Sequence, residues 1–147
     1  MHVRDVMTQH PACCTPGTPI GDVARMMVEH DCGAIPVVAD LANRQPLGIV
    51  TDRDIVTRTI AAGIDPAQLS AGDCMTAPAI TIAEDSTLRD CLELLELSRI
   101  RRAIVVDAAG GCIGIVAQAD IAWHATKRET GDLVREVSKP SEPAFTS

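Results

Sequence analysis

The 147-residue chain has almost no aromatic side chains, since it contains one Phe, one Trp and no Tyr. Positive charge is also scarce: 13 Lys and Arg stand against 20 Asp and Glu, which gives a formal net charge of −7. A protein that binds nucleic acid needs a basic face for the phosphate backbone, and single strands stack on aromatic platforms. The composition therefore argues against a nucleic acid as a partner.

Long apolar runs are missing as well. No stretch approaches the roughly 18 uninterrupted apolar residues of a transmembrane helix. The N-terminal segment MHVRDVMTQHPA lacks the apolar run and the small-residue cleavage pattern of a signal peptide. We therefore expect a cytoplasmic protein with no membrane partner. Because 46% of the residues are hydrophobic, an aliphatic core is expected in one domain, or in two small ones that share a core.

The six cysteines, at 13, 14, 32, 74, 91 and 112, form no CxxC pair. Most lie among apolar residues, which is typical of buried thiols in a reducing compartment. A zinc site made from Cys13, Cys14, Cys32 and the scattered histidines would have no paired ligand motif, so no metal site is predicted. A thiol or metal sensor that uses Cys13 and Cys14 stays open as an alternative.

Motifs of catalysis are lacking too. The sequence has no P-loop, no convincing Ser-His-Asp set and no Cys-His pair at motif spacing. The glycines of GGCIG at 110–114 are not a dinucleotide fingerprint, because they lie in an expected hairpin turn and no helix opens after them. We predict no enzymatic activity and no catalytic residue.

What the chain does contain is an internal repeat. Residues 5–38 align with 73–106 without a gap, so that DVMT matches DCMT and IPVV matches AIVV. After a hairpin that is two residues shorter, GIVTDRDI at 48–55 aligns with GIVAQADI at 114–121. The unit is longer than a solenoid repeat, and two copies indicate two small subdomains packed on each other.

Each copy has the same expected order of strand, helix, strand, strand, helix. Apolar residues at helical spacing predict helices over 18–31 and 86–99, with Thr18 and Ser86 as N-caps. Two apolar runs around a polar turn then predict a hairpin, and a second helix follows, which Gly63 ends in the first copy. This order predicts an α/β fold of two small sheets with helices on them.

The domain boundaries follow from the repeat. We place the first repeat at 1–66 and the second at 67–126. The remaining residues, 127–147, are expected to form a C-terminal helical extension and a polar, Pro-rich, disordered tail.

The motifs resemble a pair of CBS domains. The resemblance rests on VMT with a nearby Pro, on IPVV, and above all on the G-h-h-T-x-x-D pattern of Gly48, Thr51 and Asp54, and it covers residues 3 to about 125. TDRDIV followed by AAGIDP is also similar to the small stand-alone bacterial two-CBS proteins of the hypoxic response protein 1 type.

The resemblance implies a module of two β-α-β-β-α repeats with pseudo-twofold symmetry, often paired into a homodimer. It further implies that the cleft between the repeats binds an adenosine-containing nucleotide such as AMP, ADP or ATP as a regulatory ligand, with no cofactor required and no catalysis. Such a protein would signal through a conformational or dimer change, to which an unknown protein partner could respond.

The resemblance also assigns site residues. Asp54 and Asp120 match the ribose position, where one carboxylate can accept hydrogen bonds from both ribose hydroxyls. The remaining candidates, for phosphate or backbone contact, are Thr51, Arg53, Gly48, Gly114, Arg101 and Arg102. Threonine and arginine donate hydrogen bonds to phosphate, and glycine lets backbone or ligand approach closely.

Each assignment has an alternative. Thr51 to Asp54 is also a capping box, which would stabilise a helix with no ligand. Asp120 has lost its box partner, because Ala117 replaces the threonine, and could serve the helix dipole alone. The arginines could instead be solvated or pair with Glu93 and Glu96.

Two functions follow from these alternatives. In the first, 48–55 is the better ribose-phosphate site and 114–121 a weakened or adenosine-preferring one. In the second, the chain is a ligand-independent dimeric interaction scaffold in a stress response. The apolar helical segments MMV and CLELLEL could supply a dimer face in either case.

Overall fold

The computed structural model describes residues 1–130. The predicted tail therefore lies outside the described residues, as does most of the predicted extension at 127–147. Among the described helices, none is long and apolar enough to cross a membrane.

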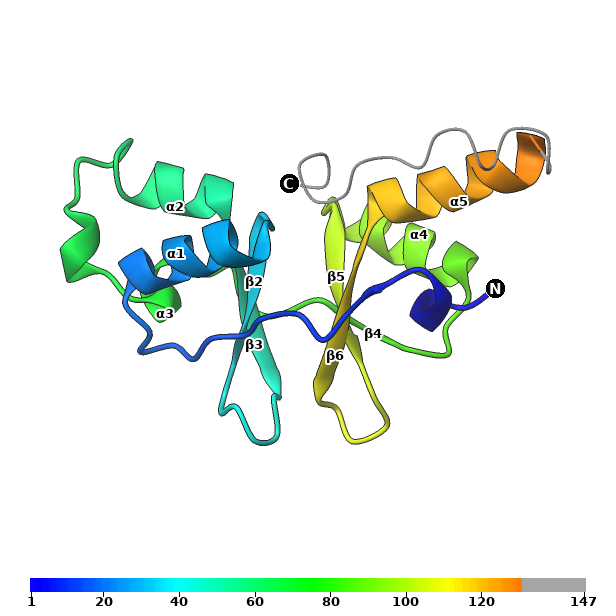
Figure 1. Ribbon diagram of the computed structural model, residues 1–147, viewed down its shortest axis with the longest axis horizontal. Helices are drawn as coiled ribbons and strands as arrows, with labels where there is room; N and C mark the ends of the chain where they lie inside the picture. Colours follow the sequence, from blue (N-terminus) through cyan, green and yellow to red (C-terminus); the bar gives the residue numbers. More distant parts are fainter. Residues whose placement is uncertain (131–147) are drawn as a thin grey trace.

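The two repeats form two lobes that lie side by side (Figure 1). The elements of the first lobe are α1 (Ile20–His30), β2 (Ala34–Val38), β3 (Pro46–Thr51), α2 (Asp52–Arg58), the 3-10 turn η2 (Pro66–Gln68) and α3 (Ala71–Cys74). Those of the second are β4 (Thr81–Ala83), α4 (Leu88–Ser98), β5 (Arg102–Val106), β6 (Cys112–Ala117) and α5 (Gln118–Thr130). The predicted α/β fold of two similar repeats is confirmed.

The two sheets differ in size. In the second lobe β4 runs parallel to β5 and β5 antiparallel to β6, and β1 (Thr8–Gln9) completes the order β1-β6-β5-β4. The first lobe has only the antiparallel pair β2-β3. The strand expected before α1 is reduced to a single parallel bridge between Cys14 and Val37.

The Met-Thr segment of each repeat is exchanged into the other lobe. β1, from the first repeat, pairs with β6 of the second, with Thr8 opposite Ile115. In return Thr76 pairs with Ile49 on β3 through backbone hydrogen bonds of 3.1 and 2.9 Å. The N-terminal segment starts beside α4 and α5 and crosses to the first lobe (Figure 1).

The cores follow this exchange. Val3, in the 3-10 turn η1 (Val3–Asp5), and Val6 are buried in the core of the second lobe, with Cys91 and Leu95. Ala71 and Cys74 are buried in the core of the first. The predicted division at 66/67 stays a division of the sequence, since the packing crosses it in both directions.

The core is aliphatic, as the composition predicts, and four of the six cysteines contribute to it. Cys14, Cys74, Cys91 and Cys112 are buried, whereas Cys13 and Cys32 are partly exposed. A small third cluster of Val38, Ile104 and Cys112 joins the two hairpins. Burial of these apolar side chains contributes to holding the lobes against each other.

The two predicted N-caps, Ser86 and Thr18, and the predicted end of α2 at Gly63 are wrong by a few residues. Thr87, not Ser86, caps α4 by accepting from the Asp90 amide at 3.1 Å, and the Ser86 amide donates to the Ala83 carbonyl in the turn before the helix. Thr18 does not cap α1, since its hydroxyl accepts from the Thr15 amide instead.

Gly63 does not end α2, which stops at Arg58. The next residue, Thr59, leaves helical geometry, and its hydroxyl donates to the Ile55 carbonyl at 2.6 Å. A side chain that bonds back to the preceding turn in this way competes with continued helix.

Gly48 and Gly114 are where the exchanged segments come closest to the sheets. A Cβ on Gly48 would lie 2.7 Å from the Thr76 carbonyl oxygen and 2.9 Å from Met75 Sδ. A Cβ on Gly114 would lie 3.0 Å from the Thr8 carbonyl oxygen and would also collide with Met7. Both glycines are therefore explained by close approach of backbone.

We predict that Gly48→Ala lowers the free energy of unfolding by about 1–3 kcal/mol, because the carbonyl of Thr76 cannot move away without breaking its strand pairing. Gly17→Ala is the matched control, since a Cβ there meets nothing within 4 Å. Urea unfolding of both variants measures the difference. Equal stability of Gly48→Ala and the control would contradict this account of the glycine.

Candidate functional site

A cavity of about 390 Å³ lies where the two repeats meet. Thr51, Arg53 and Asp54 come to it from the end of β3 and the start of α2. Arg99 and Arg101 come from the connection between α4 and β5 in the other repeat, and Arg102 from the first position of β5. The lining also includes Ile49, Asp52, Thr76, Pro78, Ile80, Ile100 and Ile104. The structure thus brings five of the eight predicted site residues together in this cavity: Thr51, Arg53, Asp54, Arg101 and Arg102.

The Asp54 carboxylate is fixed by contacts to both repeats. Its Oδ2 accepts from the Thr51 amide at 2.9 Å, and its own amide donates to Thr51 Oγ1 at 3.1 Å, which completes the predicted capping box. Its other oxygen, Oδ1, accepts from the hydroxyl of Thr76 at 3.4 Å. The capping bond therefore uses one oxygen and leaves the other against a hydroxyl of the cavity wall.

The backbone at the end of α4 carries the arginines to the cavity. Arg99 adopts a left-handed conformation, with φ 54°, and its amide bonds to the Leu95 and Glu96 carbonyls to end the helix. The chain then turns into β5 with Arg101 exposed and Arg102 partly buried. Burial lowers the pKa of Arg102 from its usual value, while the carboxylates of Asp52 and Asp54 oppose that shift. These two carboxylates therefore act on a guanidinium from the other repeat.

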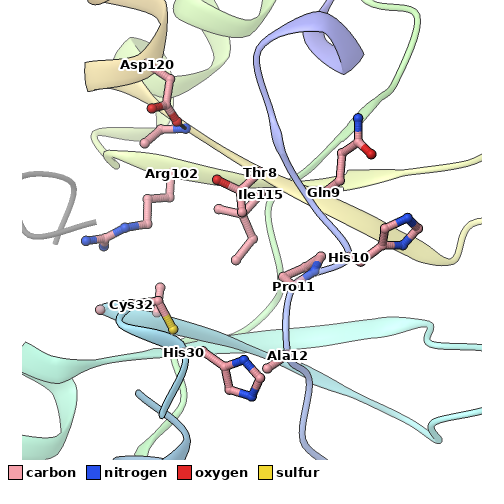
Figure 2. A pocket seen from close by; sticks show the side chains of 13 residues that line it. Thr8, Gln9, His10, Pro11, Ala12, His30, Cys32, Arg102, Ile115 and Asp120 are labelled. Atoms are coloured by element: carbon pink, nitrogen blue, oxygen red, sulfur yellow. Dashed lines mark hydrogen bonds between the residues drawn. The ribbon is translucent and has the colours of Figure 1, made fainter. Parts of the chain in front are cut away.

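A second cavity of about 260 Å³ lies at the pseudo-equivalent place (Figure 2). Its lining is Thr8, Gln9, His10, Pro11, Ala12, His30, Cys32, Gly33, Ala34, Arg102, Ile115, Ala117 and Asp120. Figure 2 shows Arg102 and Asp120 on one side, with His30 and Cys32 opposite. Arg102 lines both cavities, so it links the two sites.

The second cavity lacks several groups of the first. Ala117 stands where the first has Thr51, and Gly33 and Ala34 stand where it has Arg101 and Arg102. Asp120 keeps half of the capping box, since its Oδ2 accepts from the Ala117 amide at 3.2 Å. A structural role for Asp120 therefore exists beyond the helix dipole.

Gly48 and Gly114 are not among the residues that line the two cavities. They lie instead where the exchanged Met-Thr segments pack closely against the strands, and the absence of a side chain allows this close packing. Their close contacts are with backbone and methionine side chains of these segments, and backbone approach is one of the two possibilities that the sequence left open.

Sequence reasoning missed Thr8 and Thr76, which occupy equivalent places in the two cavities. The signal was present, because both follow Met in the repeated Met-Thr pairs. Their sites could not be assigned without the exchange of these segments. His10 and His30 were also missed, and nothing in their spacing distinguishes them from surface histidines.

Histidine and cysteine are also the side chains that bind zinc. Within residues 1–130, no three His, Cys, Asp or Glu side chains gather closely enough to hold a metal ion. Cys13, Cys14 and Cys32 in particular do not form such a group.

Comparison with known proteins agrees with this geometry. The family model of the CBS domain matches residues 3–60 and again 71–125. Hypoxic response protein 1 of Mycobacterium tuberculosis is 31% identical over 137 residues, which cover 93% of this chain and 94% of that protein. The CBS domain-containing protein YhcV of Bacillus subtilis is 34% identical over 137 residues, 92% of this chain and 94% of YhcV.

Among solved structures, CBSX2 of Arabidopsis thaliana in complex with AMP has a TM-score of 0.74 and 26% identity. The match covers 87% of this chain and 98% of CBSX2. The predicted resemblance, including that to the hypoxic response protein 1 type, is confirmed. With two family matches in tandem and a cleft lined by both repeats, the chain belongs to the CBS domain family and is a CBS-pair protein.

Proposed function

We propose that this CBS-pair protein is a regulatory protein that binds an adenosine-containing nucleotide, AMP, ADP or ATP, between its repeats. The observation that carries the proposal is the composition of the larger cavity. A carboxylate and a hydroxyl from one repeat, Asp54 and Thr51, face guanidinium groups from the other, Arg101 and Arg102. The AMP complex of CBSX2 supports a ligand of this class.

Each part of a nucleotide finds suitable chemistry in this cavity. The Asp54 carboxylate would accept from the ribose hydroxyls, a charge-assisted arrangement. Thr51, Arg53, Arg101 and Arg102 would donate to phosphate, and guanidinium can do so through two parallel hydrogen bonds. Ile49, Ile80 and Ile104 line the cavity, and their apolar side chains would pack against the base.

The second cavity would be the weaker site. Asp120 would bind ribose there, and Arg102 is the arginine that its wall offers. The missing hydroxyl at Ala117 removes about one hydrogen bond, worth on the order of 0.5–1.5 kcal/mol. We propose that this site prefers adenosine or binds nucleotide several-fold more weakly.

Signalling would follow from the fact that residues of both repeats line each cavity. Because each cavity is built from both repeats, a bound nucleotide would favour one relative position of the lobes over others. We further propose a cytoplasmic homodimer without catalytic activity. Val28 on α1 and Leu97 on α4, exposed at 81% and 85%, lie in the segments that the sequence suggested for a dimer face.

The second candidate function is a ligand-independent interaction scaffold. The observation in its favour is that the Thr51–Asp54 capping box is satisfied by the chain's own groups. Asp54 then has a structural reason to be present, and the exposed apolar residues would bind a partner protein. The two functions differ in what a nucleotide does to stability.

We predict that AMP, ADP or ATP raises the melting temperature of the protein. A ligand at about 100 times its Kd adds roughly 2.7 kcal/mol, a shift of several degrees for a chain of this size. Asp54→Asn should abolish most of the shift and Asp120→Asn only a small part. Thermal unfolding with each nucleotide measures this. No shift with any of the three, in a protein that unfolds cooperatively, would favour the scaffold.

We also predict that Arg101→Gln and Arg102→Gln weaken ATP binding far more than adenosine binding. A hydrogen bond to a charged group is worth about 1.5–3 kcal/mol, so about a tenfold or greater rise in the Kd for ATP is expected. Arg89→Gln is the control, because Arg89 is an exposed arginine on α4 that does not line the cavity. Calorimetry with ATP and adenosine measures both ligands. Equal losses for the two would contradict phosphate contact.

The capping role of Asp54 can be separated from its ligand role. Without ligand, Asp54→Ala should lower the free energy of unfolding by about 1 kcal/mol, because the Thr51 amide loses its acceptor. Asp54→Asn keeps an acceptor oxygen and should lie closer to the wild type. Chemical unfolding in the absence of nucleotide gives both values. If Asp54→Asn is as unstable as Asp54→Ala, the asparagine oxygen does not replace the carboxylate as the acceptor for the Thr51 amide. That outcome would contradict the separation of the two roles.

A further inference from the structure

Cys13 and Cys112 come together although they are far apart in the chain. Their Sγ atoms are 4.0 Å apart, and the Arg44 guanidinium donates to Cys13 Sγ at 3.0 Å. The three residues come from the segment after β1, from β6 and from the turn between β2 and β3. This cluster differs from the Cys13–Cys14 pair that the sequence suggested.

Arg44 is held in place by both cysteine-bearing segments. Its guanidinium donates to the Pro11 carbonyl at 2.7 Å, and its own carbonyl accepts from the Cys112 amide at 2.8 Å. Its backbone is left-handed, with φ 57°. A guanidinium with this much support stays beside the Cys13 sulfur, where a positive charge favours the thiolate.

The two thiols differ in protonation. The hydrogen bond between Cys13 and Cys112, together with the Arg44 guanidinium, lowers the pKa of Cys13 to about 6 against the effect of burial. The same hydrogen bond to Cys13 and burial raise the pKa of Cys112. Burial raises the pKa of the adjacent Cys14 to about 11. These shifts favour the thiolate on Cys13 and the thiol on Cys112.

The two thiols also differ in access. Cys13 is partly exposed, whereas Cys112 is 1% exposed. A small oxidant from solvent would therefore react with Cys13 first. Cys112 would then react with the oxidised Cys13 sulfur and not with the oxidant. This is the arrangement of a reactive thiol next to a resolving one.

We propose that Cys13 is a site of oxidation by hydroperoxides and that Cys112 resolves it to an intramolecular disulfide. The Cys13 thiolate attacks the terminal peroxide oxygen; the O–O bond breaks, the alkoxide or hydroxide leaves and takes a proton from water, and Cys13 becomes a sulfenic acid. The Cys112 sulfur then attacks Cys13 Sγ. The S–O bond breaks, the hydroxide leaves with the Cys112 proton as water, and the S–S bond forms.

The disulfide would act on the second cavity. An S–S bond is about 2.05 Å long, so the two sulfurs must move closer by about 2 Å. Pro11 and Ala12 precede Cys13 and line that cavity, as does Ile115 on the strand of Cys112. Oxidation would therefore link covalently the two segments that carry these lining residues. This effect does not depend on whether the second cavity binds a nucleotide.

The test treats the fully reduced protein with one equivalent of hydrogen peroxide and then alkylates the remaining thiols. We expect a mass loss of two hydrogens, two fewer alkylated thiols, and a Cys13–Cys112 linkage in the non-reduced peptide map. In Cys112→Ala the reaction should stop at the sulfenic acid of Cys13, which dimedone traps. Cys13→Ser should form no disulfide, and the control Cys32→Ser, at another partly exposed thiol, should behave as the wild type.

A second measurement does not depend on the cysteine variants. The rate of Cys13 alkylation by iodoacetamide should fall as the pH drops through about 6, where the thiolate becomes protonated. Arg44→Met should move this midpoint upward and slow the reaction below the new pKa about tenfold for each unit of the rise. A disulfide between other cysteines, a Cys13 that reacts no faster than Cys32, or over-oxidation of Cys13 with no bond to Cys112 would overturn the proposal.

Discussion

The rest of the structure depends on the close packing of each Met-Thr segment against a glycine of the opposite repeat. Thr76 pairs with the strand of Gly48, and Thr8 pairs with the strand of Gly114. A side chain at either glycine would collide with a backbone carbonyl. Because the exchange is mutual, neither core is complete without residues from the other copy, and the two repeats form one packed unit.

The exchange also builds the cavities. Each Met-Thr pair packs on the opposite repeat, which brings Thr76 to Asp54 and Thr8 to the second cavity. Arg101, just before β5, and Arg102, at its start, line the same cavity as Asp52 and Asp54 at the start of α2. In a chain of net charge −7, this places positive charge at the cleft between repeats, where an anionic ligand could be held from both sides.

Asp54 shows how one side chain can serve the fold and a site together. One carboxylate oxygen caps α2, and the other meets a hydroxyl of the cavity wall. Asp120 keeps the first contact although its threonine partner is replaced by Ala117. The two repeats thus share a scaffold and differ in the polar groups that line their cavities, which is the physical basis for expecting unequal sites.

The sequence by itself determined the repeat, the α/β order of elements, the hairpins and the capping box at Thr51–Asp54, because these depend on local patterns of apolar, polar and glycine residues. It also marked Asp54, Arg101 and Arg102 as candidates. Only the tertiary structure decided that the Met-Thr segments change lobes, that Arg102 lines both cavities and that Cys13 meets Cys112 and Arg44. These contacts join residues distant in sequence, and no local propensity specifies which distant surfaces will pack together.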